Sequence, residues 1–299
     1  KDNNSLYEVS IGSENGSLEA NTNGSGMFSY LDNVDTLDLT GLDTSNMTSM
    51  SYMFYNSNSL KSVNLSNFNT SKLLYANNMF NGCTSLESLD LSNFNTSKVV
   101  TMSFMFDGCT NLENLNLSSF NTSKITSMNA MFGDCESLTS LDLSSFDTSN
   151  VTSMRSTFQN CNSLISLDLS NFNTSKVTLM EEMFRSCHSL LNLNLSGFDT
   201  SSVTSTWYMF RDCDKLTELD LSSFNTSKVT NMNSMFGNCT TLKTIYVSEL
   251  WDVSNVPSSD SIFYNCQLLA GAVSYDRTKT DKTMANYTTG YLTYKKNTN

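Results

Sequence analysis

The eight cysteines of this 299-residue chain recur at a nearly constant interval, 26 residues for every step but the last. They are Cys83, Cys109, Cys135, Cys161, Cys187, Cys213, Cys239 and Cys266. Such a series could form disulfides in an exported protein or bind zinc. In stacked coils, however, the Cβ atoms of neighbouring cysteines would point in parallel and lie nearly a full coil spacing of about 4.8 Å apart, whereas a disulfide needs roughly 3.8 Å. A single row of ligands also cannot surround zinc tetrahedrally. We therefore expect buried free thiols and no metal site.

The chain has one histidine, His188, directly after Cys187. Ser-His-Asp, Cys-His and multi-His chemistry would all depend on this one side chain. Cys187 belongs to the regular cysteine series, which we expect to lie in the core, and no other repeated position combines a nucleophile with a base. We predict a protein that is not an enzyme, with no catalytic residues and no cofactor.

A second series alternates Asp and Asn at the same interval, with Ser or Thr two residues later. It comprises Asp38, Asn64, Asp90, Asn116, Asp142, Asp168, Asn194 and Asp220. The favoured interpretation is a solvated sheet face with side-chain hydrogen bonds, in which Asn relieves repulsion between stacked carboxylates. The alternative is a polar binding strip for glycans, basic peptides or calcium, with Asp90, Asp142, Asp168 and Asp220 as ligand-binding candidates. Calcium would bind weakly, because it prefers six or more oxygen ligands.

Trp207 and Tyr208 occupy two adjacent positions that vary freely from one repeat to the next. Exposed aromatic side chains are favoured anchors of protein interfaces, so both residues are candidates for ligand binding. In the alternative interpretation, Trp207 packs inward where the usual Met is replaced by Thr206.

All of these residues belong to one repeated unit of 26 residues. Its marker is a Leu-x-Leu pair that recurs from Leu37/Leu39 to Leu219/Leu221, with Val63 in one copy and a degenerate ninth copy at Ile245/Val247. A period of 20–29 residues with this core indicates a leucine-rich-repeat solenoid. We divide the chain into an N-terminal cap with a half-repeat (1–36), eight full repeats (37–244), and a degenerate ninth repeat with a C-terminal cap (245–299).

Each unit is predicted to form a strand, a capped short helix and a turn. In the third copy, alternation around Leu89 and Leu91 predicts a strand, and Asn95 is placed to cap a helix. Apolar residues then follow at helical spacing to Cys109, and Gly108 is a residue that commonly ends a helix. The predicted fold is a right-handed α/β leucine-rich-repeat solenoid, with a parallel sheet on one face and short helices on the other.

Composition excludes several classes of function. The formal charge is −12, from 29 acidic and 17 basic side chains, so nucleic acid is a poor candidate partner. No run of 18 or more apolar residues could span a membrane. Both ends of the repeat array look capped, and we expect a monomer.

The repeat, which reads LDLSNFNTSKVTxMxxMFxxCxSL, resembles the BspA-like leucine-rich repeats of bacterial surface proteins. The segment from Gly271 to Tyr291 is similar to the tail that often follows those repeats. This resemblance implies an exported cell-surface protein connected with adhesion to host matrix, mucus or other cells. The family has no shared catalytic residues and no common ligand.

The leading hypothesis is a non-enzymatic bacterial surface module, an adhesin that binds host matrix protein, mucin or another cell. One alternative is a structural spacer that projects another domain from the surface. The other is a glycan- or calcium-binding module that uses the Asp/Asn series.

Overall fold

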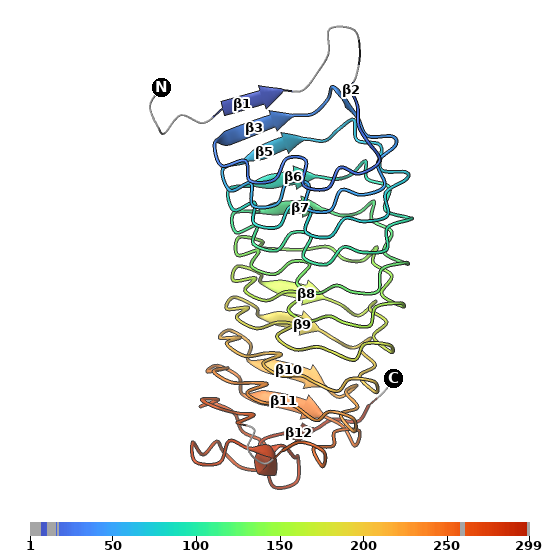
Figure 1. The fold of residues 1–299 in the computed structure, drawn as a ribbon. Helices are drawn as coiled ribbons and strands as arrows, with labels where there is room; N and C mark the ends of the chain where they lie inside the picture. Colours follow the sequence, from blue (N-terminus) through green and yellow to red (C-terminus); the bar gives the residue numbers. More distant parts are fainter. Residues whose placement is uncertain (1–6, 11–15, 17, 258–260, 298–299) are drawn as a thin grey trace. The chain divides into compact units, whose positions relative to one another are not determined.

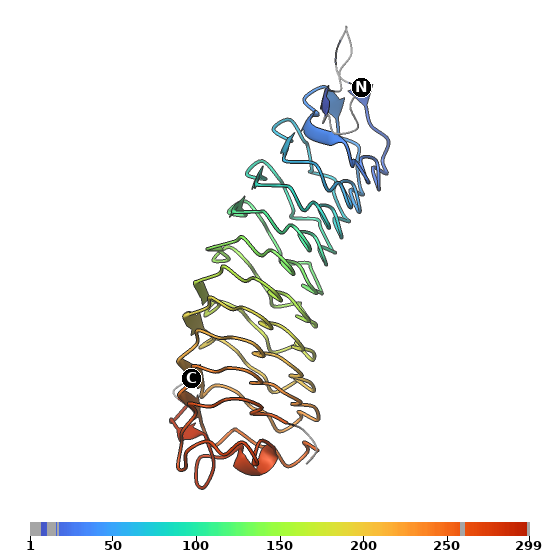
Figure 2. The same ribbon diagram turned by 90° about the vertical axis from the view of Figure 1, so that its left-hand side faces the viewer.

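The computed structural model describes residues 7–10, 16, 18–257 and 261–297, and the chain forms two compact units, 1–146 and 147–299. Each unit is a stack of coils, with most of its strands along one edge (Figures 1 and 2). Unit 1 contains β1 (Tyr7–Ser10), β2 (Leu18–Glu19), β3 (Val34–Asp38), β4 (Leu42–Asp43), β5 (Ser62–Asn64), β6 (Ser88–Asp90) and β7 (Asn114–Asn116). Unit 2 contains β8 (Ser166–Asp168), β9 (Asn192–Asn194), β10 (Glu218–Leu221), β11 (Thr244–Val247), the 3-10 helix η1 (Lys282–Met284) and β12 (Thr293–Tyr294).

Between the repeats of each unit, strands pair at the 26-residue period of the sequence. All of these pairs are parallel, and the register joins Leu37 to Val63 and Leu89 to Leu115 in unit 1. In unit 2 it joins Leu167 to Leu193 and Leu219 to Ile245. A second line of parallel bridges runs through the coils at residues such as Ser49, Tyr75 and Thr101. Consecutive repeats are therefore in register at two places in the coil.

The predicted solenoid of parallel strands is confirmed within each unit, whereas the predicted short helices are wrong. The part of the chain that the structure describes contains no α-helix, and its one helical element is η1. The segment that follows each strand consists of consecutive tight turns, so the coil is a parallel β coil closed by turns.

Backbone geometry explains why turns replace the helix. In the third copy Phe104 has a φ of 60° and Gly108 a φ of 73°, in the left-handed region that interrupts a right-handed helix. Met105 N donates to Met102 O at 3.2 Å within the coil, whereas Phe104 N donates to Asn129 O at 2.8 Å in the next coil. Alternate amides thus bond within and between coils, which satisfies the backbone as a helix would. An isolated helix this short would be marginal by itself.

The expected cap residue does accept a backbone hydrogen bond, but it opens a turn. Asn95 Oδ1 accepts from Ser97 N at 3.1 Å, and Val99 N donates to Thr96 O at 2.9 Å. This is the local hydrogen bonding by which Asn and Asp favour turns as well as helix starts. The series of Asp and Asn at this position therefore fits either structure.

The core consists of the repeated apolar residues predicted to face inward. In the third copy the buried set, with at most 1% exposure, is Val99, Met102, Met105, Phe106, Cys109 and Leu112. Phenylalanines of successive coils stack, with centroids 5.1 Å apart for Phe54 and Phe80 in unit 1 and 5.5 Å for Phe184 and Phe210 in unit 2. Such offset stacks add to the stabilisation that burial of the rings provides.

A buried threonine in each repeat joins neighbouring coils by hydrogen bonds. Thr96 is 2% exposed, and its Oγ1 accepts from Asn121 N at 2.7 Å and donates to Asn121 O at 3.0 Å. Thr174 Oγ1 likewise donates to Asp199 O at 2.8 Å in unit 2. These hydroxyls satisfy backbone groups that the turn leaves without a partner.

The C-terminal segment packs against the last coil of unit 2. β12 pairs in parallel with β11. Tyr291 is fully buried with its ring edge-on to Phe263, at a centroid distance of 5.4 Å. Trp251 Nε1 donates to Ala285 O at 3.1 Å. These contacts bury the last phenylalanine of the stack, and the proposed division of the chain at residues 36 and 244 stays a prediction.

Candidate functional site

All eight cysteines are buried free thiols, as predicted. Thiols of this series donate to a phenylalanine carbonyl of the preceding coil, for example Cys109 Sγ to Phe80 O at 3.2 Å. Ser57 occupies the same position in the first copy, and its Oγ donates to Phe28 O at 2.8 Å. Burial raises the pKa of Cys83 to about 12, so the thiolate needed for reaction or metal binding is disfavoured.

Cys187 and His188 have different partners and do not form a catalytic pair. Cys187 Sγ donates to Phe158 O at 3.1 Å, and burial raises the pKa of this thiol to about 12. The exposed His188 has its Nδ1 2.6 Å from Asp214 Oδ2. The histidine therefore pairs with a carboxylate at the surface.

In the Asp/Asn series, the side chain accepts a hydrogen bond from the amide two residues later, which closes a turn. Asp90 Oδ1 accepts from Ser92 N at 2.9 Å, and Asp142 Oδ1 accepts from Ser144 N at the same distance. These backbone hydrogen bonds are the largest cause of the lowered pKa of both aspartates. Asn serves equally well because its Oδ1 is also an acceptor. Asp90 and Asp142 are exposed in unit 1, and their part in binding stays a prediction.

Asp168 and Asp220, the candidates in unit 2, line one concavity on the sheet face. This concavity of 470 Å³ extends across β8, β9, β10 and Tyr246, and includes Lys295 from the C-terminal segment. Asp168 Oδ1 accepts from Ser170 N at 2.9 Å, the largest cause of its lowered pKa. Both carboxylates face solvent, so the fold brings two of the four aspartate candidates to one surface.

Lys295 is held across the sheet face by two interactions. Its ammonium forms an ion pair with Asp220 and lies 5.4 Å from the centroid of the Tyr246 ring. Burial raises the pKa of Asp220, but the hydrogen bonds from Lys295 and Ser222 outweigh it, and the net shift is downward. This contact shows that the Asp series can pair with a lysine side chain.

Sequence reasoning missed an apolar pair beside these carboxylates. Ile165 and Leu191 are 48% and 49% exposed at the start of adjacent strands, where Leu191 N donates to Ile165 O at 2.8 Å. The same position holds Lys61, Glu87 and Glu113 in earlier copies. That change from charged to apolar residues could have indicated this pair from the sequence alone. We call Ile165, Leu191, Asp168, Asp220 and Tyr246 the sheet-face surface.

Trp207 and Tyr208 are half-buried and packed on each other, with ring centroids 4.4 Å apart. The guanidinium carbons of Arg185 and Arg211 lie 5.4 and 4.7 Å from the Tyr208 centroid, within cation–π range. Thr206, which replaces the usual Met, is itself buried and donates to Met235 Sδ at 3.3 Å. The pair is thus a partly covered aromatic cluster with arginines beside it.

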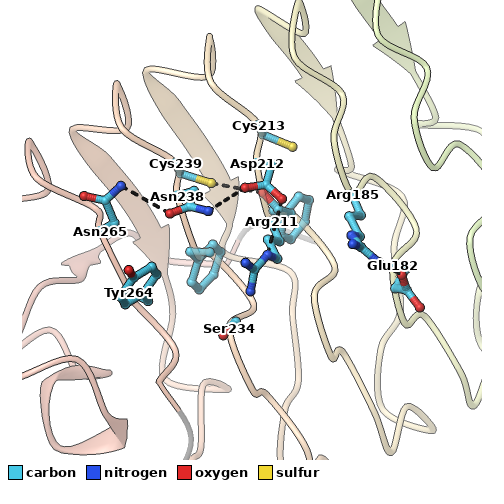
Figure 3. A network of polar contacts seen from close by, with 12 residues as sticks. Glu182, Arg185, Arg211, Asp212, Cys213, Ser234, Asn238, Cys239, Tyr264 and Asn265 are labelled. Atoms are coloured by element: carbon cyan, nitrogen blue, oxygen red, sulfur yellow. Dashed lines mark hydrogen bonds and ion pairs between the residues drawn. The ribbon is translucent and has the colours of Figure 1, made fainter. Parts of the chain in front are cut away.

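Polar side chains extend this cluster toward the C-terminal end of unit 2 (Figure 3). Arg185 forms an ion pair with Glu182, and Arg211 forms one with Asp212 at 3.3 Å. Asn238 Nδ2 donates to Asp212 Oδ1 at 2.7 Å, and Asn265 Nδ2 donates to Asn238 Oδ1 at 3.2 Å. A chain of hydrogen bonds thus leads from Arg211 to Asn265.

Metal-binding clusters and membrane-spanning helices are both absent from the described ranges. No group of three His, Cys, Asp or Glu side chains there is arranged to hold a metal ion. No helix within those ranges has the length and apolar character needed to cross a membrane.

The sequence matches a family model in four overlapping segments, residues 22–140, 87–190, 163–276 and 191–298. The family is DUF285, described as a Mycoplasma protein of unknown function. The chain belongs to the DUF285 family. A search of curated proteins finds no match for this family member.

Two solved structures are similar to this DUF285 member over much of its length. One is a leucine-rich repeat protein from Bacteroides ovatus, with 16% identity, 99% of this chain and 97% of that chain covered, and a TM-score of 0.27. The other is the functional domain of InlJ from Listeria monocytogenes, described as including a cysteine ladder. It is 15% identical, with 73% of this chain and 63% of that chain covered and a TM-score of 0.16.

Proposed function

We propose that this DUF285 member is a non-enzymatic interaction module outside a bacterial cell, an adhesin for host matrix protein, mucin or another cell. The resemblance of its repeat to BspA-like surface proteins supports the location and the class. Its buried thiols, with the pKa of Cys83 and Cys187 raised to about 12, support a non-enzymatic role.

The sheet-face surface is the observation that carries the proposal. Leu191, Asp168 and Asp220 line its concavity of 470 Å³. The exposed Ile165 lies beside Leu191, whose amide donates to the Ile165 carbonyl. Interfaces commonly have an apolar centre with a charged rim. An acidic rim on a chain of charge −12 favours a partner that presents lysine or arginine, as Lys295 does to Asp220.

A structural spacer is less well supported by this surface. A spacer has no need of half-exposed apolar side chains, and charged residues fill the same position in copies of unit 1. Exposed apolar groups that gather beside a concavity are typical of binding sites.

Binding of the full chain to immobilised mucin, fibronectin and fibrinogen tests the proposal. We expect saturable binding that is lost in the double variant Ile165→Ser/Leu191→Ser and weakened in Asp168→Asn. The matched control is Val273→Ser, which removes another exposed apolar side chain outside this surface. Absence of binding to every such target, or equal binding by the double variant and the control, would contradict the proposal.

A further inference from the structure

The C-terminal segment forms a second concavity, which we call the C-terminal pocket. It has a volume of 640 Å³ and is lined by Tyr264, Asn265, Gln267, Tyr275 and Arg277. The first three residues belong to the last coil, and the other two follow the antiparallel bridge between Ala270 and Ser274. Figure 3 shows Tyr264 and Asn265 projecting beside Asn238 at the end of the polar chain described above.

The lining residues are fixed by hydrogen bonds to one another. Asn265 N donates to the Tyr275 hydroxyl at 3.0 Å, and Gln267 Nε2 donates to Asn265 Oδ1 at 2.6 Å. Asn265 has a φ of 60°, and its Nδ2 is bonded to Asn238. A site held in one geometry before binding loses less entropy when a ligand arrives.

The adjoining backbone is fixed as well. Asp276 N donates to the hydroxyl of the buried Tyr291 at 2.8 Å, and that hydroxyl donates to Lys279 O at 2.9 Å. Arg277 therefore lies in a short loop anchored on both sides. The pocket is built from two segments that the fold holds together.

The side chains that face the pocket combine three kinds of recognition. Tyr264 is 54% exposed and offers a ring face, while the amide of Gln267 and the hydroxyl of Tyr275 offer polar groups. Burial raises the pKa of Tyr275, which keeps its hydroxyl protonated and able to donate. The exposed Arg277 guanidinium forms no ion pair with the carboxylates of the described residues.

We propose that the C-terminal pocket binds a sugar that carries a carboxylate, with the pyranose ring on Tyr264, its hydroxyls on Gln267 and Tyr275, and its carboxylate on Arg277. An aromatic ring face accepts the apolar face of a sugar, and amides bond to its hydroxyls. A planar guanidinium matches a carboxylate through two parallel hydrogen bonds. This arginine in an acidic chain is the feature that selects a charged sugar over a neutral one.

A glycan array with sialylated, uronate-containing and matched neutral glycans, followed by titration calorimetry on the full chain, tests the inference. We expect wild-type protein to prefer a carboxylated glycan over its neutral counterpart, and the array to show whether a sialic or a uronic acid is preferred. Arg277→Gln is expected to weaken carboxylated-glycan binding at least about tenfold and to remove the preference. Tyr264→Ala is expected to abolish binding of both kinds.

Two controls separate recognition from damage to the fold. Lys279→Gln removes a nearby positive charge, and Leu268→Ala removes an exposed side chain next to Gln267, yet neither residue lines the pocket. Both variants should bind as wild type does, with thermal unfolding unchanged. No binding of carboxylated glycans by the wild type, or equal losses in Arg277→Gln and Lys279→Gln, would overturn the inference. Binding to mucin and matrix protein is compared in the presence of excess free carboxylated glycan, which occupies the C-terminal pocket. Because Ile165→Ser/Leu191→Ser should leave glycan binding intact, this result and the adhesin proposal can then fail separately.

Discussion

Individual side chains in this protein take their properties from their place in the coil. The carboxyl group of Asp107 is an instructive case, because burial and the nearby charge of Asp134 raise its pKa from 3.8 to about 7, against the opposing effect of a hydrogen bond from Asn81. The exposed Asp90 and Asp142 shift the other way, because backbone amides bond to their charged form. The same residue type is thus destabilising in one position and favourable in another.

Asp107 should make the protein less stable as pH rises. The folded chain holds this proton more tightly than the unfolded chain, so stability is lost between about pH 4 and the folded pKa of about 7. We expect Asp107→Asn to stabilise the protein by about 1–2 kcal/mol near neutral and higher pH, since solvent screens part of the full effect at a partly exposed group. Thermal unfolding at low and high pH measures this. An equal gain at about pH 4 would contradict the assignment.

The buried thiols predict a simple reactivity pattern. A thiol reagent should modify none of the eight cysteines in the folded protein and all eight after unfolding in urea without reductant. Quantitative thiol titration checks both numbers. Fewer than eight reactive thiols in the unfolded chain would show that some cysteines are oxidised.

At the scale of the element, the coil depends on hydrogen bonds between turns. Thr96 carries one such link, since its buried hydroxyl serves both backbone groups of Asn121. The coil also needs a residue with left-handed backbone conformation in the middle of the turn segment, and Ser156, with a φ of 53°, is an example. The hydrogen bonds between coils and the left-handed residue together favour turns over a helix.

Thr96→Val should destabilise the protein by about 1–3 kcal/mol, because it keeps the shape but leaves the amide and carbonyl of Asn121 unpaired. Thr96→Ser retains the hydroxyl and should cost clearly less. Urea unfolding of the two variants gives the comparison. Equal stabilities would mean that the hydroxyl link contributes little.

Ser156→Val should also destabilise, by about 1–2 kcal/mol, because a β-branched residue is strained at positive φ. Ser156→Gly relieves that strain and is expected to be more stable than the valine variant by at least this amount. Denaturant midpoints of the pair test the turn geometry directly. A valine variant as stable as the glycine variant would instead favour the helix that the sequence suggested.

The sequence predicts the period, the strand positions and the buried residues well, because each is repeated in nearly every copy. It does not predict the turns, because the left-handed position of Phe104 and Ser156 holds ordinary residues in place of glycine. Apolar spacing at intervals of three and four also suits successive turns as well as a helix. The apolar pair of the sheet-face surface could have been found from the sequence, since Ile165 and Leu191 stand at a repeat position that is polar in the other full repeats.

At the scale of the whole molecule, some repeat positions hold the same kind of residue in nearly every copy, and these maintain the coil. Other repeat positions vary between copies, and these distinguish its surfaces. The core phenylalanines and cysteines recur almost unchanged, whereas Ile165, Leu191, Trp207 and Tyr264 stand in columns that vary. All four lie in unit 2. Since the folded core does not require these side chains, their position at the surface favours a binding role. The acidic rim of the sheet-face surface further implies binding that weakens with added salt.

The most direct test of the adhesin proposal measures how beads coated with the full chain attach to mucin- or matrix-coated surfaces. Wild type is compared at equal coating density with the variants Ile165→Ser/Leu191→Ser, Trp207→Ser and Val273→Ser. We predict firm attachment by wild type and Val273→Ser, and loss of attachment in the double variant of the sheet-face surface. Attachment by the double variant equal to that of wild type would contradict the adhesin proposal and favour a spacer.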